Sequence, residues 1–150
     1  MEEIIFNYEK FQEQGRNCLK ELELREDILN IQKNKMLSFD YSAESVELIM
    51  VVINSFKNSY LNKSISFEVL NKYLFGLGWY LGETILKNGL SSKGGKWCAS
   101  QTIPGFEGKT ITFLQDSKGM MHFPIFKVQK YLANGEVDDL KQFFNSCINM

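Results

Sequence analysis

Three glycines inside an apolar helical pattern place the strongest constraint on how this chain folds. Within residues 66–88 the segment GLGWYLG sets Gly76, Gly78 and Gly82 among apolar positions three and four residues apart. Each glycine inside a helix costs about 1 kcal/mol relative to alanine, so three of them suggest a compensating contact. Gly78 and Gly82 lie one turn apart on one face, which predicts that another backbone approaches this helix closely. Gly89 is expected to end the helix.

Two helical regions precede this glycine-containing segment. Residues 2–33 carry one apolar stripe and predict one or two helices, with Gly15 as a possible break. A second helix is expected to start after SFDYSAES and to present a wide apolar face from Ser45 to Phe56. The polar stretch KNSYLNKS, residues 57–64, has the composition of a loop.

The hydrophobic period changes from Lys96 onward, where three short strands are expected. KWCAS and TITFLQ are separated by the turn region TIPGFEGK, and the turn DSKG leads into MMHFP. Two short helices, PIFKVQKYLANG and EVDDLKQFFNSCI, follow. The order predicts one α+β domain over residues 1–150, in which N-terminal helices pack on a small antiparallel three-stranded meander and two short helices close the chain.

Charge and cysteine content argue against several function classes. The net charge of −1 provides no overall field for nucleic acid or an anionic membrane, and Lys93 and Lys96 are too sparse to change that balance. Three widely spaced cysteines without a CxxC pair argue against a disulfide framework. The acidic N-terminus differs from a secretory signal, and the run 48–53 is too short to span a bilayer. We therefore expect a cytoplasmic protein that binds neither nucleic acid nor membrane.

No cofactor is expected from the motifs. The single histidine, His122, and the lack of HExxH or EF-hand patterns argue against a metal site. The segments GLGWYLG and SSKGGK lack the order of a phosphate-binding loop. One catalytic arrangement stays open, in which Cys98 and His122 lie on neighbouring strands and Glu83 orients the histidine. The simpler interpretation is a buried Cys98 and an outward-facing His122.

Glu83 is an acid in an otherwise apolar stretch, and it allows three interpretations. A buried carboxylate needs hydrogen bonds or a cation. The following turn, SSKGGKW, offers backbone N–H groups, two lysines and Trp97. We favour a structural polar strut made by Glu83 and Trp97 that fixes this turn to the helix. Contact with a partner and catalysis are the alternatives.

Two places could contact a protein partner. Phe106 follows Pro104 and Gly105 in a turn, where a large aromatic side chain either folds back over the core or is exposed as an anchor. Glu136, Asp138 and Asp139 form an acidic cluster, with Glu2 and Glu3 as a second one, and either would suit a basic partner. The cluster is equally explained as the negative start of the last helix.

Four motifs together resemble a group of small bacterial proteins. They are DYSAESVELI (40–49), GWYLGETILKN (78–88), GGKW (94–97) and FPIFKVQKYLANGEVDDL (123–140). Some members of such groups resemble immunity proteins that neutralise a cognate toxin of a polymorphic toxin system. The resemblance implies a non-enzymatic protein whose partner is a toxin, blocked by occlusion. Residues 2–33 fall outside the resemblance and would be the variable part that determines the partner.

Other functions remain open at this stage. A small-molecule or peptide-binding module would place its pocket between the glycine-rich helix and the meander. A hydrolase would use Glu83, or Cys98 with His122. An assembly subunit would form a stable homo-oligomer, and the sequence leaves the oligomeric state undetermined.

Overall fold

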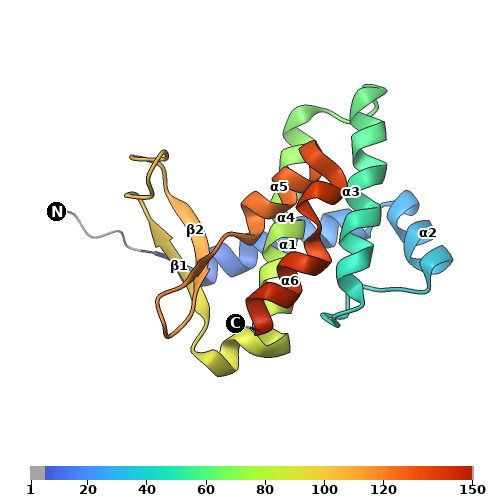
Figure 1. Cartoon of the computed structure of the whole chain (residues 1–150). Helices are drawn as coiled ribbons and strands as arrows, with labels where there is room; N and C mark the ends of the chain where they lie inside the picture. Colours follow the sequence, from blue (N-terminus) through green and yellow to red (C-terminus); the bar gives the residue numbers. More distant parts are fainter. Residues whose placement is uncertain (1–5, 150) are drawn as a thin grey trace.

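The chain forms an α+β domain in which a small sheet stands at one end of a helical body (Figure 1). The computed structural model describes residues 6–149, except the side chain of Glu136. The predicted fold class is confirmed, with a three-stranded antiparallel sheet and two short C-terminal helices. The helices are α1 (Tyr8–Glu23), α2 (Glu26–Lys35), α3 (Ser45–Leu61), α4 (Phe67–Ile85), α5 (Pro124–Asn134) and α6 (Leu140–Asn149), and the strands are β1 (Lys96–Ser100), β2 (Ile111–Gln115) and β3 (Met121–His122).

Helix α4 runs through the middle of the molecule, with α1, α3, α5 and α6 packed around it (Figure 1). Ser66 caps its N-terminus by accepting from the N–H of Val69, so the helix starts as the sequence predicts. From Gly76 to Ile85 every residue is buried. Such complete burial identifies α4 as the element on which the rest of the fold is assembled.

The glycines of α4 permit the close approach that the sequence predicts. A Cβ placed on Gly78 would lie 2.7 Å from the Cα of Ile125, at the start of α5. A Cβ on Gly82 would lie 2.2 Å from the ring of Trp97, in β1. Both distances are far below a normal van der Waals contact, so only glycine allows α5 and the sheet to sit this near to α4.

The order of the sheet is β1-β2-β3, and both pairs are antiparallel. Trp97, Leu114 and His122 are cross-strand neighbours on one face, and all three are buried. Cys98 and Phe113 are paired on the opposite face. The sheet therefore packs one face against the helices and leaves the other half-exposed.

Three expectations about helix boundaries are wrong. Gly15 lies inside α1 against the ring of Trp79, and the break falls instead at Leu24–Arg25. Residues 57–61 continue α3, where Tyr60 contacts Phe67, so the loop predicted from their polar composition is wrong for this part. Gly89 lies inside a π-turn, Leu86–Leu90, with a φ of 155° rather than a left-handed helical cap.

The last helix also starts later than the sequence predicts. Residues Gly135–Asp138 form a short 3-10 turn, and α6 begins only at Leu140. Asp139 accepts hydrogen bonds from the backbone N–H groups of Lys141 and Gln142, at 2.8 and 3.5 Å. Asp139 thus acts as the cap of α6 rather than as part of its first turn. None of the helices described is long and apolar enough to cross a membrane.

Candidate functional site

Glu83 accepts two side-chain hydrogen bonds inside the domain. The indole N–H of Trp97 donates to Oε2 over 3.0 Å, and the amide of Gln12 donates to Oε1 over 3.1 Å. The three side chains are 9, 4 and 8% exposed for Glu83, Trp97 and Gln12. One carboxylate therefore joins α4, the first strand of the sheet and α1.

The network around Gln12 extends to two further aromatic side chains. The indole N–H of Trp79 donates to Oε1 of Gln12 over 2.5 Å, and the Gln12 amide also donates to the hydroxyl of Tyr8 over 3.0 Å. Burial and the nearby charge of Glu83 raise the pKa of Tyr8 above its ordinary value. Every polar atom of Gln12 is thus engaged, which fixes its amide orientation.

Trp97 contacts Glu83 as expected, whereas the other bonds suggested for Glu83 are not formed in the structure described. The sequence suggested that the SSKGGKW turn and its lysines hold the carboxylate, but Trp97 is the only residue of that turn that bonds it in the structure described. The second partner, Gln12, is 71 residues away in the sequence, and no local pattern singles it out. Glu83 is a ligand of neutral donors in the interior, with little of its surface open to a substrate.

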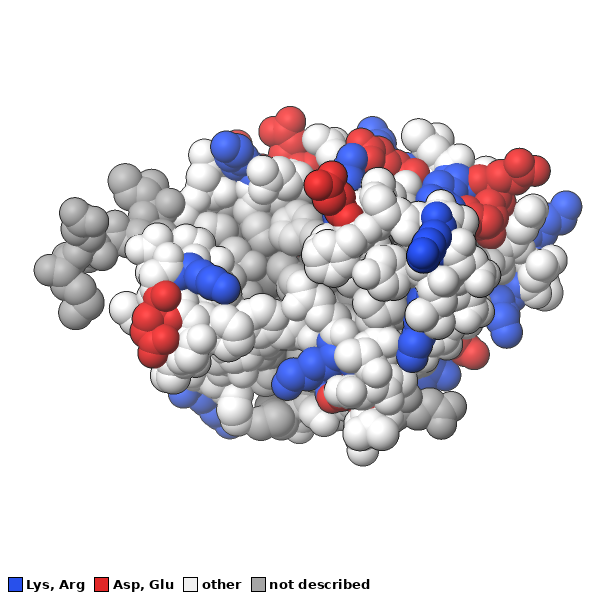
Figure 2. All heavy atoms as spheres, turned by 90° about the horizontal axis from the view of Figure 1, so that it is seen from above, with Lys and Arg blue, Asp and Glu red and all other residues white. Residues whose placement is uncertain are grey.

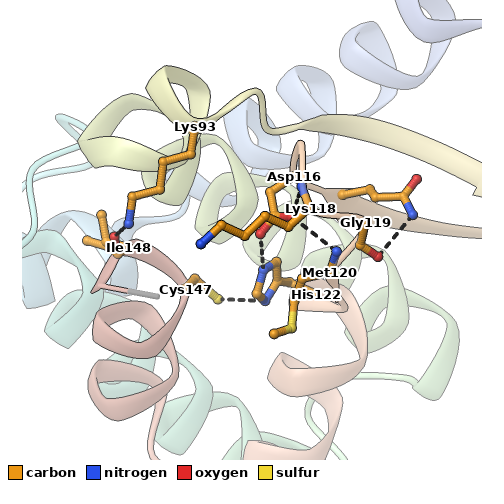
Figure 3. Close-up of polar contacts among 9 residues, drawn as sticks. Lys93, Asp116, Lys118, Gly119, Met120, His122, Cys147 and Ile148 are labelled. Atoms are coloured by element: carbon orange, nitrogen blue, oxygen red, sulfur yellow. Dashed lines mark hydrogen bonds and ion pairs between the residues drawn. The ribbon is translucent and has the colours of Figure 1, made fainter.

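A second polar chain connects the end of the sheet to α6 (Figure 3). The thiol of Cys147 lies 3.5 Å from Nδ1 of His122, and Nε2 of His122 lies 3.7 Å from Oδ2 of Asp116. Asp116 also accepts from the N–H groups of Lys118 and Met120, at 2.9 and 3.0 Å. Burial acts to raise the pKa of Asp116, but these N–H groups and His122 lower it overall.

The order thiol, imidazole and carboxylate is the order of a cysteine-based catalytic triad. Two features oppose that use. Burial raises the pKa of Cys147 to about 12, and the residue is only 2% exposed. It also lies in the last turn of α6, where the helix dipole disfavours a thiolate. Cys147 and His122 therefore form a buried polar contact that joins α6 to the sheet.

The arrangement of Cys98, His122 and Glu83 suggested by the sequence is not formed. His122 pairs with Leu114 on the buried face of the sheet, whereas Cys98 lies on the other face. Glu83 is bonded to Trp97 and Gln12 instead. His122 is buried rather than outward-facing, and Cys98 is half-exposed, so the simpler interpretation is wrong on both side chains. The sequence analysis did not identify Cys147, because Cys147 and His122 lie 25 residues apart and belong to no recognisable sequence motif.

Phe106 begins a row of four phenylalanine rings that runs inward from the surface: Phe106 is exposed, Phe126 and Phe123 are partly buried, and Phe113 is buried. Pro104 and Gly105 form a turn closed by the N–H of Phe106 and the carbonyl of Ile103, at 2.9 Å. The turn folds the Phe106 ring back, although 39% of the residue stays exposed. We call the rings the aromatic row; the centroid distances are 5.1 Å for Phe106–Phe126, 5.8 Å for Phe126–Phe123 and 5.6 Å for Phe123–Phe113.

A cavity of about 300 Å³ adjoins the aromatic row, between β3, α5 and α6. Its walls combine three phenylalanines with two lysines, and they comprise Met121, His122, Phe123, Phe126, Lys127, Lys130 and Phe143. The pocket suggested between the glycine-rich helix and the meander is closed, since the Trp97 ring and Pro124 fill the space beside Gly82. The cavity lies on the side of α5 and α6 instead.

Charged side chains of both signs are scattered over the face seen in Figure 2. Between the sheet end and the helical body this face is hollowed, and almost no charged side chain lines the hollow. Such a distribution gives no stripe of positive charge for a nucleic-acid backbone on this face. An uncharged hollow is more suited to apolar contact.

The acidic cluster is largely used inside the protein. Asp138 forms an ion pair with Lys127 at 2.9 Å and accepts from the amide of Asn134 at 2.8 Å. Asp139 caps α6. The side chain of Glu136, like Glu2 and Glu3, lies outside the described residues. The two described carboxylates are therefore committed to local structure, and the aromatic row is the more available surface.

No family model, curated protein or solved structure that was compared with the chain matches it. Within the described residues, no three His, Cys, Asp or Glu side chains form a group that could hold a metal ion.

Proposed function

We propose that this protein is a non-enzymatic binding protein, and that a protein partner docks on the aromatic row and the adjoining cavity. The observation behind the proposal is the exposure of Phe106 at the outer end of a row of contacting phenylalanine rings, beside a concave surface. Phe106 remains 39% exposed although Phe126 stacks against it. Aromatic side chains at the centre of a surface patch contribute a large share of binding energy in protein complexes.

The two buried polar clusters, around Glu83 and around Cys147, support the proposal because neither offers a reactive group to a substrate. Glu83 is saturated by Trp97 and Gln12, and Cys147 keeps its proton because burial raises the pKa of its thiol to about 12. A nucleophile or general base needs an accessible lone pair near neutral pH. Both clusters serve instead to hold α1, α6 and the sheet in place around the docking surface.

Two rings of the row are positioned by the start of α5, which favours binding. Phe123 and Phe126 flank the first turn of α5, whose start is fixed against Gly78 of α4. A rigid anchor loses little conformational entropy when a partner binds. A standard interface covers about 800 Å² on each partner, so the row would form its centre and the surrounding loop its rim.

A narrower form of the proposal makes the partner a toxin that is neutralised by occlusion. It rests on the resemblance of the YSAES, YLGE, GGKW and FPIFKV segments to immunity-type proteins. Its test is co-expression with the product of the neighbouring reading frame. Growth restored by the wild-type chain and lost with Phe106→Ala supports this form; an adjacent product that is harmless on its own contradicts it.

Affinity capture from cells that naturally produce the protein tests the general proposal. We expect a stoichiometric partner with the wild-type chain and at least a tenfold loss with Phe106→Ala, about 1.4 kcal/mol of binding energy. Tyr60→Ala is the matched control, because Tyr60 is 42% exposed but belongs to the α3–α4 hairpin. Equal capture by both variants contradicts the assignment of the surface.

A further inference from the structure

The cavity beside the aromatic row combines apolar walls with an excess of positive charge. Lys127 is paired with Asp138 at 2.9 Å, and its side chain is 22% exposed. Lys130, one turn further along α5, is exposed, and no described carboxylate forms an ion pair with it. Asp138 also interacts electrostatically with Lys130, so among the described side chains of this rim two lysines share one aspartate and positive charge is in excess.

The cavity as a whole has room for about one large side chain. Its volume of about 300 Å³ lies at the lower end of the range for small-ligand pockets. Phe123, Phe126 and Phe143 supply apolar surface to its wall, although part of each ring is already in contact with another ring or with Lys127. A ligand that matches both the apolar wall and the positively charged rim has an apolar group inside the cavity and a negative charge near Lys130.

We propose that the cavity takes an aromatic side chain from the partner, next to a carboxylate that pairs with Lys130. The occupant is thus an acidic segment with an aromatic anchor. This inference rests on the proposed function and adds the chemistry of the partner. Charge complementarity is the ground for it, since a carboxylate beside the cavity gains an ion pair with Lys130, whereas a basic segment would add positive charge next to Lys127 and Lys130.

Two small probes separate charge from shape. N-acetylphenylalanine carries the aromatic group and a carboxylate, and N-acetylphenylalaninamide has the same size without the charge. Titration of the isotope-labelled full chain, followed by the amide NMR signals, reports where each probe binds. We expect both probes to shift the signals of Met121, Phe126 and Phe143, with the acid binding roughly fivefold more tightly.

Lys130→Gln should remove the preference for the acid, so that both probes bind with equal affinity. Lys57→Gln, a substitution on the exposed surface of α3, is the matched control and should leave the preference unchanged. Equal binding of acid and amide to the wild-type chain overturns the charge assignment. Shifts confined to residues outside the cavity, or no shifts, overturn the site.

The outcomes distinguish this inference from the proposed function. A captured partner that depends on Phe106, with no probe bound in the cavity, overturns the inference and leaves the docking surface standing. Acid-selective probe binding in a chain that captures no partner supports the site chemistry and contradicts the protein-binding function. The folding of Lys130→Gln is verified by its unchanged NMR dispersion before either result is interpreted.

Discussion

Trp97 donates its indole N–H to the carboxylate of Glu83 over 3.0 Å, and this bond joins the first strand to the central helix. Gly82 lies against the same indole ring, so the bond and the ring contact position the sheet together. Gln12 closes the arrangement from α1 at 3.1 Å. The docking surface that we propose is formed by elements held in this way.

Replacing Glu83 by glutamine should destabilise the protein by about 1–3 kcal/mol, because Trp97 and Gln12 donate to different carboxylate oxygens and the NH₂ group of glutamine would face one of these two donors. The free energy of unfolding from urea titration measures this effect. Glu47→Gln is the control, since Glu47 forms only a half-exposed ion pair with Lys141 and its loss should cost less than about 1 kcal/mol. Equal losses in the two variants contradict the role assigned to Glu83.

Gly82→Ala should destabilise the protein although alanine is the better helix former. The new methyl group would meet the Trp97 ring, and such overpacking costs about 1–3 kcal/mol. Asn71→Ala, at an exposed position of the same helix, should be neutral or slightly stabilising. Thermal unfolding of both variants checks the prediction, and a Gly82→Ala protein as stable as the wild type refutes the close contact.

Cys147 should resist alkylation in the native protein. Its thiol is buried and has a pKa of about 12, so almost no thiolate exists near neutral pH. Cys98 is half-exposed and should be modified first. Timed treatment with iodoacetamide, followed by peptide mass spectrometry, measures both rates in one sample. Modification of Cys147 ahead of Cys98 would indicate an activated nucleophile and favour a triad with His122.

Asp138 should stabilise the protein only while it is ionised. Lys127 and Asn134 hold its pKa below the ordinary value, so its contribution is present above about pH 4 and is lost as the pH falls through the folded pKa. The melting temperature of Asp138→Asn should therefore be lower than that of the wild type at about pH 6, with a smaller difference at a pH below the ordinary pKa of aspartate. A difference that is the same at both pH values contradicts the ion pair.

Local patterns predicted much of the fold because they report on single elements. The glycine face of α4 and the change of period at Lys96 each depend on a few neighbouring residues, and the structure has both. The loop expected at residues 57–64 was wrong for its first part, because residues 57–61 continue α3 and Tyr60 near its end contacts Phe67 at the start of α4. The late start of α6 follows instead from a local cap, since Asp139 accepts from the backbone N–H groups of Lys141 and Gln142.

The candidate site was harder to predict because its partners are distant in the sequence. Gln12 reaches Glu83 only after α1 packs on α4, and Cys147 reaches His122 only after α6 docks. The phenylalanine row is assembled from the β1–β2 loop, β2 and the start of α5. The sequence pointed to Phe106 because the Pro104–Gly105 turn before it is formed by neighbouring residues. It gave no sign that Phe126, which is distant in the sequence, would stack against Phe106.

Hydrogen–deuterium exchange of the protein, alone and with its captured partner, tests the central claim most directly. The account predicts slower exchange in the complex for residues 103–108 and 121–130, which include the Phe106 turn and the wall of the cavity. Unchanged exchange there, with protection confined to α1 and α2, would contradict it. The partner would then be recognised by the N-terminal helices instead of the aromatic row.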